Sequence, residues 1–199
     1  METTMRLLWN LIGLFGLAVL IVIVVAIVQV GPAITNVASF DSQALTTYSD
    51  IARTLIKTGN GAEATVWKVP VEDGLSAEDV EQTMKFVANE HNIKNVGELP
   101  LYKEVEAMSG EAYRFIKIYM FCNAMTAARM IDYSDAFSAY LPCRITLLED
   151  TSGKLWLYTL NMDLMIHGGE ELPPALKDEA LQVKEIILDI MNRGAAGEF

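Results

Sequence analysis

The apolar residues of the chain are concentrated near its N-terminus. From Leu7 to Val30 there is no charged residue, and few polar residues or glycines interrupt the aliphatic and aromatic side chains. At ~1.5 Å per residue a helix of this length measures about 36 Å, enough to cross the ~30 Å hydrocarbon core of a bilayer. The pattern predicts one transmembrane helix. We expect it to end at Gly31-Pro32, because proline cannot continue the hydrogen-bond ladder.

The alternative for this segment is a cleaved signal peptide. Such peptides have an apolar core of about 7–15 residues after a basic start. Here the apolar run is longer, the start has only Arg6 against Glu2, and the small-residue signal at residues 37–39 is weak. The sequence therefore favours a retained anchor.

The charges that flank the apolar run predict its orientation. Arg6 is the only cation beside it on the N-terminal side, and on the other side no cation precedes Arg53, whereas Asp41 and Asp50 are acidic. Because cationic flanks remain in the cytoplasm, we expect a cytoplasmic N-terminus and an exported C-terminal domain.

Beyond the apolar run, shorter periodic patterns alternate. Alternation and apolar content predict strands, the last two forming a hairpin, at residues 65–71, 115–121, 144–149 and 154–160. Helical spacing and end signals predict helices at 45–57, 76–90 and 124–140, and from Pro173 onward. Residues 91–114 have no comparable pattern and are expected to be mainly a polar loop.

This order of elements predicts an α+β fold. We expect a single N-terminal transmembrane helix followed by a compact domain with helices on one face of a mainly antiparallel sheet. The expected divisions are a cytoplasmic tip and transmembrane helix at 1–31, a connector with a short amphipathic helix at 32–62, the domain at 63–193 and a flexible tail at 194–199.

The charge of the chain restricts its partners. Its 26 acidic and 15 basic residues give a net charge of −11, and no stripe of lysine and arginine interrupts the acidic surface. Such a surface repels phosphate backbones, so the sequence excludes nucleic-acid binding. The composition also excludes a disordered chain and a multi-disulfide miniprotein.

Two cysteine-containing segments resemble a known family. Phe121-Cys122-Asn123 precedes a predicted helix, and Leu141-Pro142-Cys143 opens a hairpin whose first strand ends in Glu149-Asp150. Over about Ala64–Met191 this arrangement resembles the bacterial DUF302 domain, whose name records that its function is unassigned. The resemblance implies a small α+β fold that often self-associates, and it supplies no catalytic residues.

Two positions beside the cysteines depart from that family pattern. Ala124 stands where the family usually has proline, and Arg144 stands where it usually has asparagine. We expect Asn123 and Arg144 to lie at the edge that meets a ligand or partner. In a bacterium, the predicted topology is that of a single-pass inner-membrane protein with a periplasmic domain.

The two cysteines are the first candidates for chemistry. Cys122 ends one predicted strand and Cys143 precedes the next, so one intervening helix returns them to the same sheet edge. In an exported domain they are expected to form either a disulfide, worth about 3 kcal/mol, or a redox-active dithiol. The alternative is a pair of partly buried structural thiols.

Sulfur ligands after the hairpin extend this candidate site. Met162, Met165 and His167 follow the last strand, in a segment expected to fold over the cysteine edge. Thiolate, thioether and imidazole groups together suit Cu(I), so the candidate metal ligands are Cys122, Cys143, Met162, Met165 and His167. The alternative is that the methionines fill gaps in the core. Because that use of methionine is common, no cofactor is expected, and copper is the secondary hypothesis.

The sequence contains no convincing catalytic constellation. His167-Gly168-Gly169 is similar to the oxyanion-hole turn of some hydrolases, but the chain has no G-x-S-x-G elbow. It also has no P-loop, dinucleotide-binding glycine motif or haem-attachment motif. We therefore expect no enzyme activity.

These observations predict a membrane-anchored accessory or interaction module, a subunit or partner of a larger membrane complex. Its expected partners are the lipid bilayer and either other membrane proteins or a second copy of the chain. Two alternatives are a periplasmic soft-metal or thiol-redox protein that uses Cys122 and Cys143, and a module that binds a small apolar ligand beside them.

Overall fold

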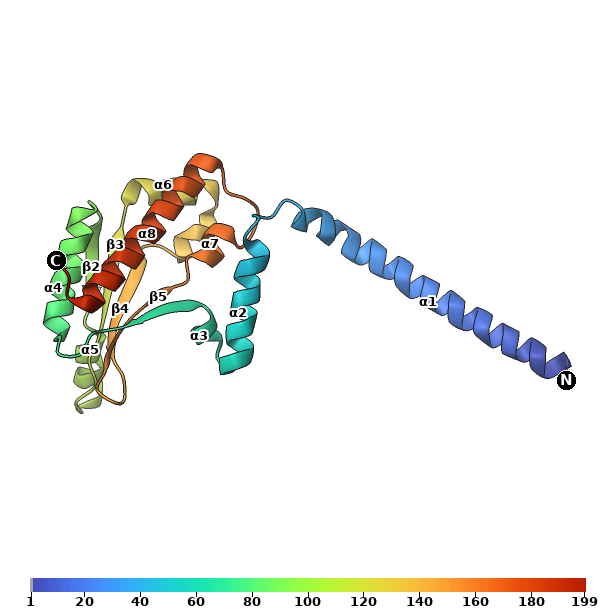
Figure 1. Ribbon diagram of the computed structural model, residues 1–199, viewed down its shortest axis with the longest axis horizontal. Coiled ribbons are helices and arrows are strands. Elements are labelled where there is room, and N and C mark those ends of the chain that lie inside the picture. Colours follow the sequence, from blue (N-terminus) through green and yellow to red (C-terminus); the bar gives the residue numbers. More distant parts are fainter. Residues whose placement is uncertain (1) are drawn as a thin grey trace. The chain divides into compact units, whose positions relative to one another are not determined.

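The computed structural model describes residues 2–199, which form two units, so Met1 lies outside the described residues. The first unit ends at Phe40 and contains one helix, α1 (Glu2–Val37); the second, Asp41–Phe199, contains every other element (Figure 1). Within α1, Ile12–Gln29 is long and apolar enough to span a membrane, and none of that segment is buried. The first unit thus fits a bilayer by length and composition.

The expected end of this helix at Gly31-Pro32 is wrong. The backbone of α1 remains helical through Pro32 to Val37. Proline fixes φ near the helical value and removes only its own N–H donor, so a helix well formed on both sides continues past it. The division we expected at residue 31 therefore falls inside α1.

The second unit is built on a five-stranded antiparallel sheet in the order β1-β5-β4-β3-β2. Its strands are β1 (Val66–Pro70), β2 (Lys94–Leu99), β3 (Ile116–Cys122), β4 (Cys143–Glu149) and β5 (Leu155–Leu160). The predicted hairpin is confirmed as β4 and β5, which pair from Ile145↔Thr159 to Glu149↔Leu155. β1 and β2 form the edges, and β3 lies inside the sheet.

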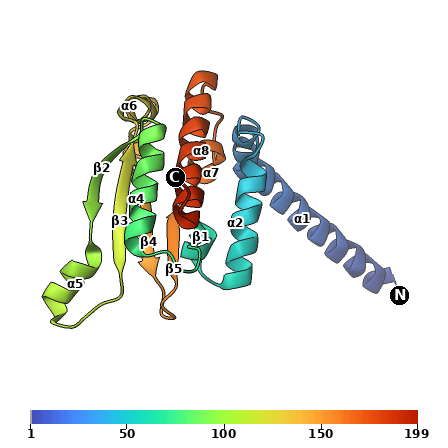
Figure 2. The same cartoon turned by 60° about the vertical axis from the view of Figure 1, so that its left-hand side comes forward.

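Helices cover one face of this sheet. The helices of the second unit are α2 (Ala44–Thr58), α3 (Gly61–Ala64), α4 (Ala77–Glu90), α5 (Leu101–Ser109), α6 (Ala124–Tyr133), the 3-10 helix η1 (Asp135–Ala139), α7 (Asp163–His167) and α8 (Pro174–Ala196). α4 and α8 lie side by side against the sheet (Figure 2). The predicted α+β class, with helices packed on an antiparallel sheet, is confirmed.

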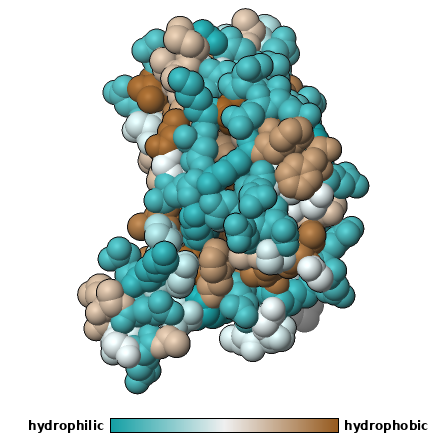
Figure 3. All heavy atoms as spheres, turned by 90° about the vertical axis from the view of Figure 1, so that its left-hand side faces the viewer, coloured by the Kyte–Doolittle hydropathy of each residue, from teal (hydrophilic) through white to brown (hydrophobic). Residues whose placement is uncertain are grey.

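Alternation along the strands places the core between the sheet and these two helices. The fully buried strand residues are Tyr119, Phe121, Ile145, Leu147 and Leu157. The helices contribute Val80, Met84 and Val87 from α4, and Ile187 and Ile190 from α8. Outside this core, the face over α4 and the C-terminus is mainly hydrophilic, with hydrophobic residues in separate spots (Figure 3).

Two regions differ from the sequence prediction. β2 and α5 occupy the expected polar loop, because an edge strand needs only a weak apolar pattern and β2 is interrupted by a bulge between Asn95 and Gly97. The helix expected at 124–140 breaks at Ser134, which is extended (φ −157°, ψ 125°), so α6 is followed by the separate helix η1.

The outer boundaries of the domain also differ. The folded unit begins at Asp41 rather than residue 63, so α2 belongs to it instead of to a connector. The expected flexible tail at 194–199 is wrong, because α8 continues to Ala196 with Gly194 and Ala195 buried. Gly197 then ends the helix in the left-handed conformation (φ 68°) that glycine adopts without strain.

Candidate functional site

The two cysteines lie at the same end of neighbouring strands. Cys122 is the last residue of β3 and Cys143 is the first of β4, where it pairs with Phe121. Antiparallel pairing brings the end of one strand beside the start of the next. We call this end of the sheet the cysteine edge. Both cysteines are free thiols.

A small apolar cavity lies at the cysteine edge. Its volume is about 30 Å³, and five sulfur-containing residues line it: Cys122, Met130, Cys143, Met162 and Met165. An adjoining cavity of about 20 Å³ shares Cys143, Met162 and Met165 with it. Volumes of this size hold about one water molecule or one ion and have no room for an organic ligand.

The structure separates one predicted ligand from the others. Met162 and Met165 line the same cavity as the cysteines, but His167 does not. Residues two positions apart on a helical turn point in different directions, so the turn that directs Met165 to the cavity directs His167 elsewhere. His167 is buried, with its Nδ1 3.1 Å from Oδ1 of Asp41. It therefore cannot belong to a sulfur site in this conformation.

The two residues predicted at a ligand or partner edge have different surroundings. The Asn123 side chain accepts hydrogen bonds from the backbone N–H groups of Met125 (3.2 Å) and Thr126 (3.3 Å), so it caps α6. Arg144 is exposed on the face of the sheet that points away from the helices, and it lines the second cavity. Asn123 thus has a structural task, whereas the Arg144 side chain is exposed to solvent.

Burial keeps the two thiols neutral. It raises the pKa of Cys143 to about 11, and the nearby Cys122 adds to the effect. Burial also raises the pKa of Cys122. A protonated thiol is a poor nucleophile, so the cysteine edge is unsuited to thiolate catalysis near neutral pH.

Hard-metal coordination has little support at this edge. Among residues 2–199, no three histidine, cysteine, aspartate or glutamate side chains gather as metal ligands. A metal ion at the cysteine edge would depend on thioether sulfur as well as thiolate sulfur, and that donor set suits Cu(I).

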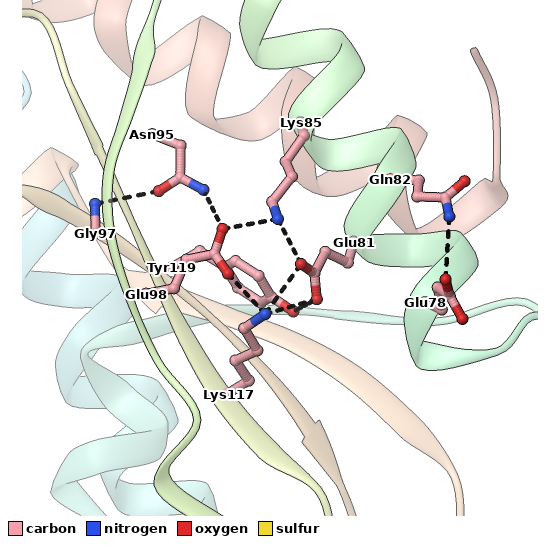
Figure 4. Close-up of polar contacts among 9 residues, drawn as sticks. All are labelled: Glu78, Glu81, Gln82, Lys85, Asn95, Gly97, Glu98, Lys117 and Tyr119. Atoms are coloured by element: carbon pink, nitrogen blue, oxygen red, sulfur yellow. Dashed lines mark hydrogen bonds and ion pairs between the residues drawn. The ribbon is translucent and has the colours of Figure 1, made fainter.

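A second polar cluster, which the sequence did not predict, joins α4 to β2 and β3 (Figure 4). Nζ of Lys117 lies 2.8 Å from Oε2 of Glu81 and 2.7 Å from Oε2 of Glu98, and Lys85 also lies 2.7 Å from Glu98. The buried hydroxyl of Tyr119 donates to Glu81 at 2.8 Å. We call these five residues the α4 charge cluster.

Positive and negative groups alternate within the α4 charge cluster. Although burial alone would raise it, hydrogen bonds from Lys117, Lys85 and Asn95 lower the pKa of Glu98 to about 2. The pKa of Tyr119 is raised by burial and by its contact with Glu81. Every charge in the cluster is paired, so its evident task is to fix α4 against the sheet edge. Its members were missed because β2, which supplies Glu98, has a weak strand pattern.

A third polar group fixes the start of the folded unit. The buried carboxylate of Asp41 lies 2.6 Å from Nζ of Lys177 and accepts a hydrogen bond from the backbone of Gln43 at 2.8 Å. Burial alone would raise its pKa, but Lys177, Gln43 and His167 together lower it to about 2. We call Asp41, His167 and Lys177 the Asp41 clasp.

Comparison with known families finds one match, and it includes the cysteine edge. The profile of the family described as "Domain of unknown function DUF302" matches residues 67–194. This chain belongs to the DUF302 family. The DUF302 region begins in β1 and ends in α8, so it contains the whole sheet and both cysteines, whereas α1, α2 and α3 precede it.

A solved DUF302 structure has a similar fold. The crystal structure of an uncharacterized conserved DUF302 protein from Bacillus stearothermophilus gives a TM-score of 0.53 at 14% sequence identity. The match covers 65% of this chain and 97% of that chain. At this identity the likeness shows the fold alone. No curated protein matches the chain.

Proposed function

We propose that this protein is a membrane-anchored interaction module whose DUF302 domain docks another membrane protein through the uncovered face of its sheet. The observation that carries the proposal is the apolar content of that face. Strand alternation places there Val66, Ile118, Met120, Leu148, Trp156, Tyr158 and Leu160. The packed helices lie on the opposite side (Figure 2), and an apolar face of this kind is typical of a protein contact surface.

The charges on this open face favour an acidic partner. None of the described strand positions on it is aspartate or glutamate, although the chain has a net charge of −11. Lys68 pairs with Glu63 at 2.9 Å, whereas Arg144 has no ion-pair partner among residues 2–199. Complementary charge sets the choice of partner, so we expect an apolar surface with an acidic rim. A second copy that presented the same face would bring no acidic strand residue to meet Arg144.

The proposed anchor would hold the docking face close to other membrane proteins. In our proposal α1 crosses the bacterial inner membrane with its N-terminus in the cytoplasm, and the DUF302 domain is periplasmic. A tethered domain meets partners in the same membrane at a raised effective concentration. A modest interface is then sufficient, and the module needs no catalytic group.

Site-specific photo-crosslinking tests the docking face. Benzoylphenylalanine in place of Tyr158, in the full chain in native membranes, should capture one discrete membrane protein, and the same group at the exposed position Gln82 of α4 should not. Arg144→Glu should lower the yield at position 158 at least fivefold, and Lys103→Glu, an equal charge change on α5, should leave it unchanged. An adduct of twice the chain mass, or equal capture at both positions, would overturn the proposal.

The sulfur-lined cavity favours a second candidate, the binding of Cu(I). Two cysteines and three methionines are among the residues that line one cavity of about 30 Å³, and a bound Cu(I) ion would displace the thiol protons. If this is correct, the purified full chain takes one Cu(I) from a chromophoric chelator, and Cys143→Ser lowers its affinity at least a hundredfold. Met125→Leu, which changes an exposed methionine outside the cavity, should have no effect. Equal Cu(I) affinity for all three proteins would contradict the copper-binding hypothesis. The cavity is also too small to favour binding of an apolar ligand.

A further inference from the structure

Helix α2 exposes its large apolar side chains. Leu45, Tyr48, Leu55 and Ile56 lie along one side of the helix, and their exposed fractions are 74%, 45%, 45% and 84%. Helical periodicity places residues at spacings of three, four, seven and eleven on a common side. We call these four residues the α2 stripe.

The side of α2 next to the stripe packs on the domain, mainly with smaller residues. Ala44 and Thr47 are its buried positions, and Ile51 and Thr54 are half-buried. A helix at the surface of a soluble protein normally turns its largest apolar residues inward. α2 does the reverse, although the hydrogen bond from the Tyr48 hydroxyl to the carbonyl of Gly168 fixes its orientation. The stripe is therefore exposed because the packing of α2 on the domain turns these side chains outward.

The chain itself limits what can cover the α2 stripe. α1 ends at Val37 and α2 begins at Ala44, and at ~3.5 Å per residue the link between them reaches at most about 25 Å. The start of α2 therefore lies no further than that from the end of α1, the helix that carries the apolar segment Ile12–Gln29. Both helices also precede the DUF302 region, which begins at residue 67.

The charges of α2 fit a neutral lipid surface. Asp50, Arg53 and Lys57 lie beside the stripe on the polar side of the helix, and Arg53 pairs with Asp50 at 2.8 Å. A single excess positive charge gives little attraction to anionic lipid. Binding by this helix would therefore depend on apolar burial, which is the main contribution in amphipathic helices at membrane interfaces.

We propose that α2 is an interfacial helix, with the α2 stripe inserted at the boundary between headgroups and acyl chains of the bilayer that α1 crosses. This inference rests on the membrane anchoring proposed above and adds a second contact with lipid. Because α1 already holds the chain at the membrane, insertion of the stripe is effectively intramolecular. It would fix the orientation in which the DUF302 domain meets its partner.

Spin-label accessibility tests this placement. Nitroxide labels are attached one at a time through Leu45→Cys, Ile56→Cys or Arg53→Cys in the full chain, with Cys122→Ser and Cys143→Ser removing the native thiols. Each protein is reconstituted in phosphatidylcholine vesicles, and its circular dichroism is compared with that of the unlabelled chain. We expect positions 45 and 56 to collide more with oxygen than with a water-soluble nickel chelate, and position 53 to show the opposite order, at both low and high salt.

Three outcomes would overturn the inference. Nickel accessibility at positions 45 and 56 equal to that at position 53 would place the stripe in water. Dipolar broadening between labels would place a second copy on it, and loss of oxygen accessibility on raising the salt would show electrostatic binding. Carbonate extraction of the same vesicles separates this test from that of the anchor. Release of the chain contradicts the anchor, whereas a retained chain with a water-exposed stripe contradicts only this inference.

Discussion

At the scale of single residues, His167 shows how local sequence can mislead. Its spacing from Met162 and Met165 predicted a common sulfur and imidazole site, but its partner is Asp41, which lies far away in the sequence. A pairing between distant residues leaves no periodic signal in one sequence. Met162 and Met165, by contrast, directly follow β5, and the predicted fold was enough to direct them to the cysteine edge.

The Asp41 clasp should make stability depend on pH in the acid range. The contacts of Asp41 lower its pKa from the ordinary value of 3.8 to about 2, so the folded state favours the carboxylate. The resulting stabilisation, about 2 kcal/mol, is complete above pH ~4 and is lost as the pH falls through 2. We expect Asp41→Asn to be less stable than the wild type at pH 6, with the difference shrinking between pH 4 and 2. Urea unfolding of both proteins across this range measures it.

The difference between the two proteins isolates Asp41, because the carboxylate of Glu98, whose pKa is also lowered to about 2, titrates in both. A difference that stays constant from pH 6 to pH 2 would show that the Asp41 carboxylate is not preferentially ionised in the folded state. A matched change at the surface, Asp73→Asn, should show no such pH dependence, because the Asp73 side chain is almost fully exposed.

At the scale of secondary-structure elements, a capping box forms the N-terminus of α4. Ser76 accepts a hydrogen bond from the backbone of Asp79 at 3.2 Å, and the Asp79 carboxylate accepts one from the backbone of Ser76 at 2.9 Å. Loss of such a cap usually costs about 1 kcal/mol. We expect Ser76→Ala to lower the free energy of unfolding by about that amount. Ser134→Ala, at the start of η1 where the side chain makes no capping bond, should change it little.

The sequence predicted well those elements whose own apolar residues recur with a clear period. β3, the β4–β5 hairpin, α4 and α8 each bury an apolar face, so their period is visible in the sequence. β2 and α5 bury little: α5 has no buried residue, and β2 contributes through Glu98 to the α4 charge cluster. Their structure depends on contacts with β3 and α4 rather than on their own pattern. The same reason explains why the cysteine edge could be predicted and the α4 charge cluster could not.

At the scale of the whole molecule, the folded unit begins at a buried carboxylate, that of Asp41. All the described core residues lie from Ala44 onward, which indicates that the second unit can fold without α1. The sequence placed its start at residue 63, where the regular strand and helix pattern begins. The structure places it at Asp41, whose backbone N–H donates to the carbonyl of Gly169 at 2.9 Å. The Asp41 clasp at this start is polar, so it leaves no apolar periodicity in the sequence from which the start could be predicted.

Two truncated chains distinguish these starts. A fragment of residues 41–199 keeps the Asp41 clasp and should melt within a few degrees of the full chain in detergent. A fragment of residues 63–199 loses Asp41 and α2, so the buried His167 loses its carboxylate partner and Lys177 keeps only Glu171. Removing one partner of a buried charge pair costs about 3–5 kcal/mol, which corresponds to about 10 °C in a protein of this size. Calorimetry of both fragments measures the shift, and equal melting temperatures would mean that the folded unit begins with the sheet. We expect the melting temperature of the shorter fragment to fall by the full amount and Asp41→Asn in the longer fragment to reproduce part of that fall. This result would show that the Asp41 carboxylate determines where the folded unit begins.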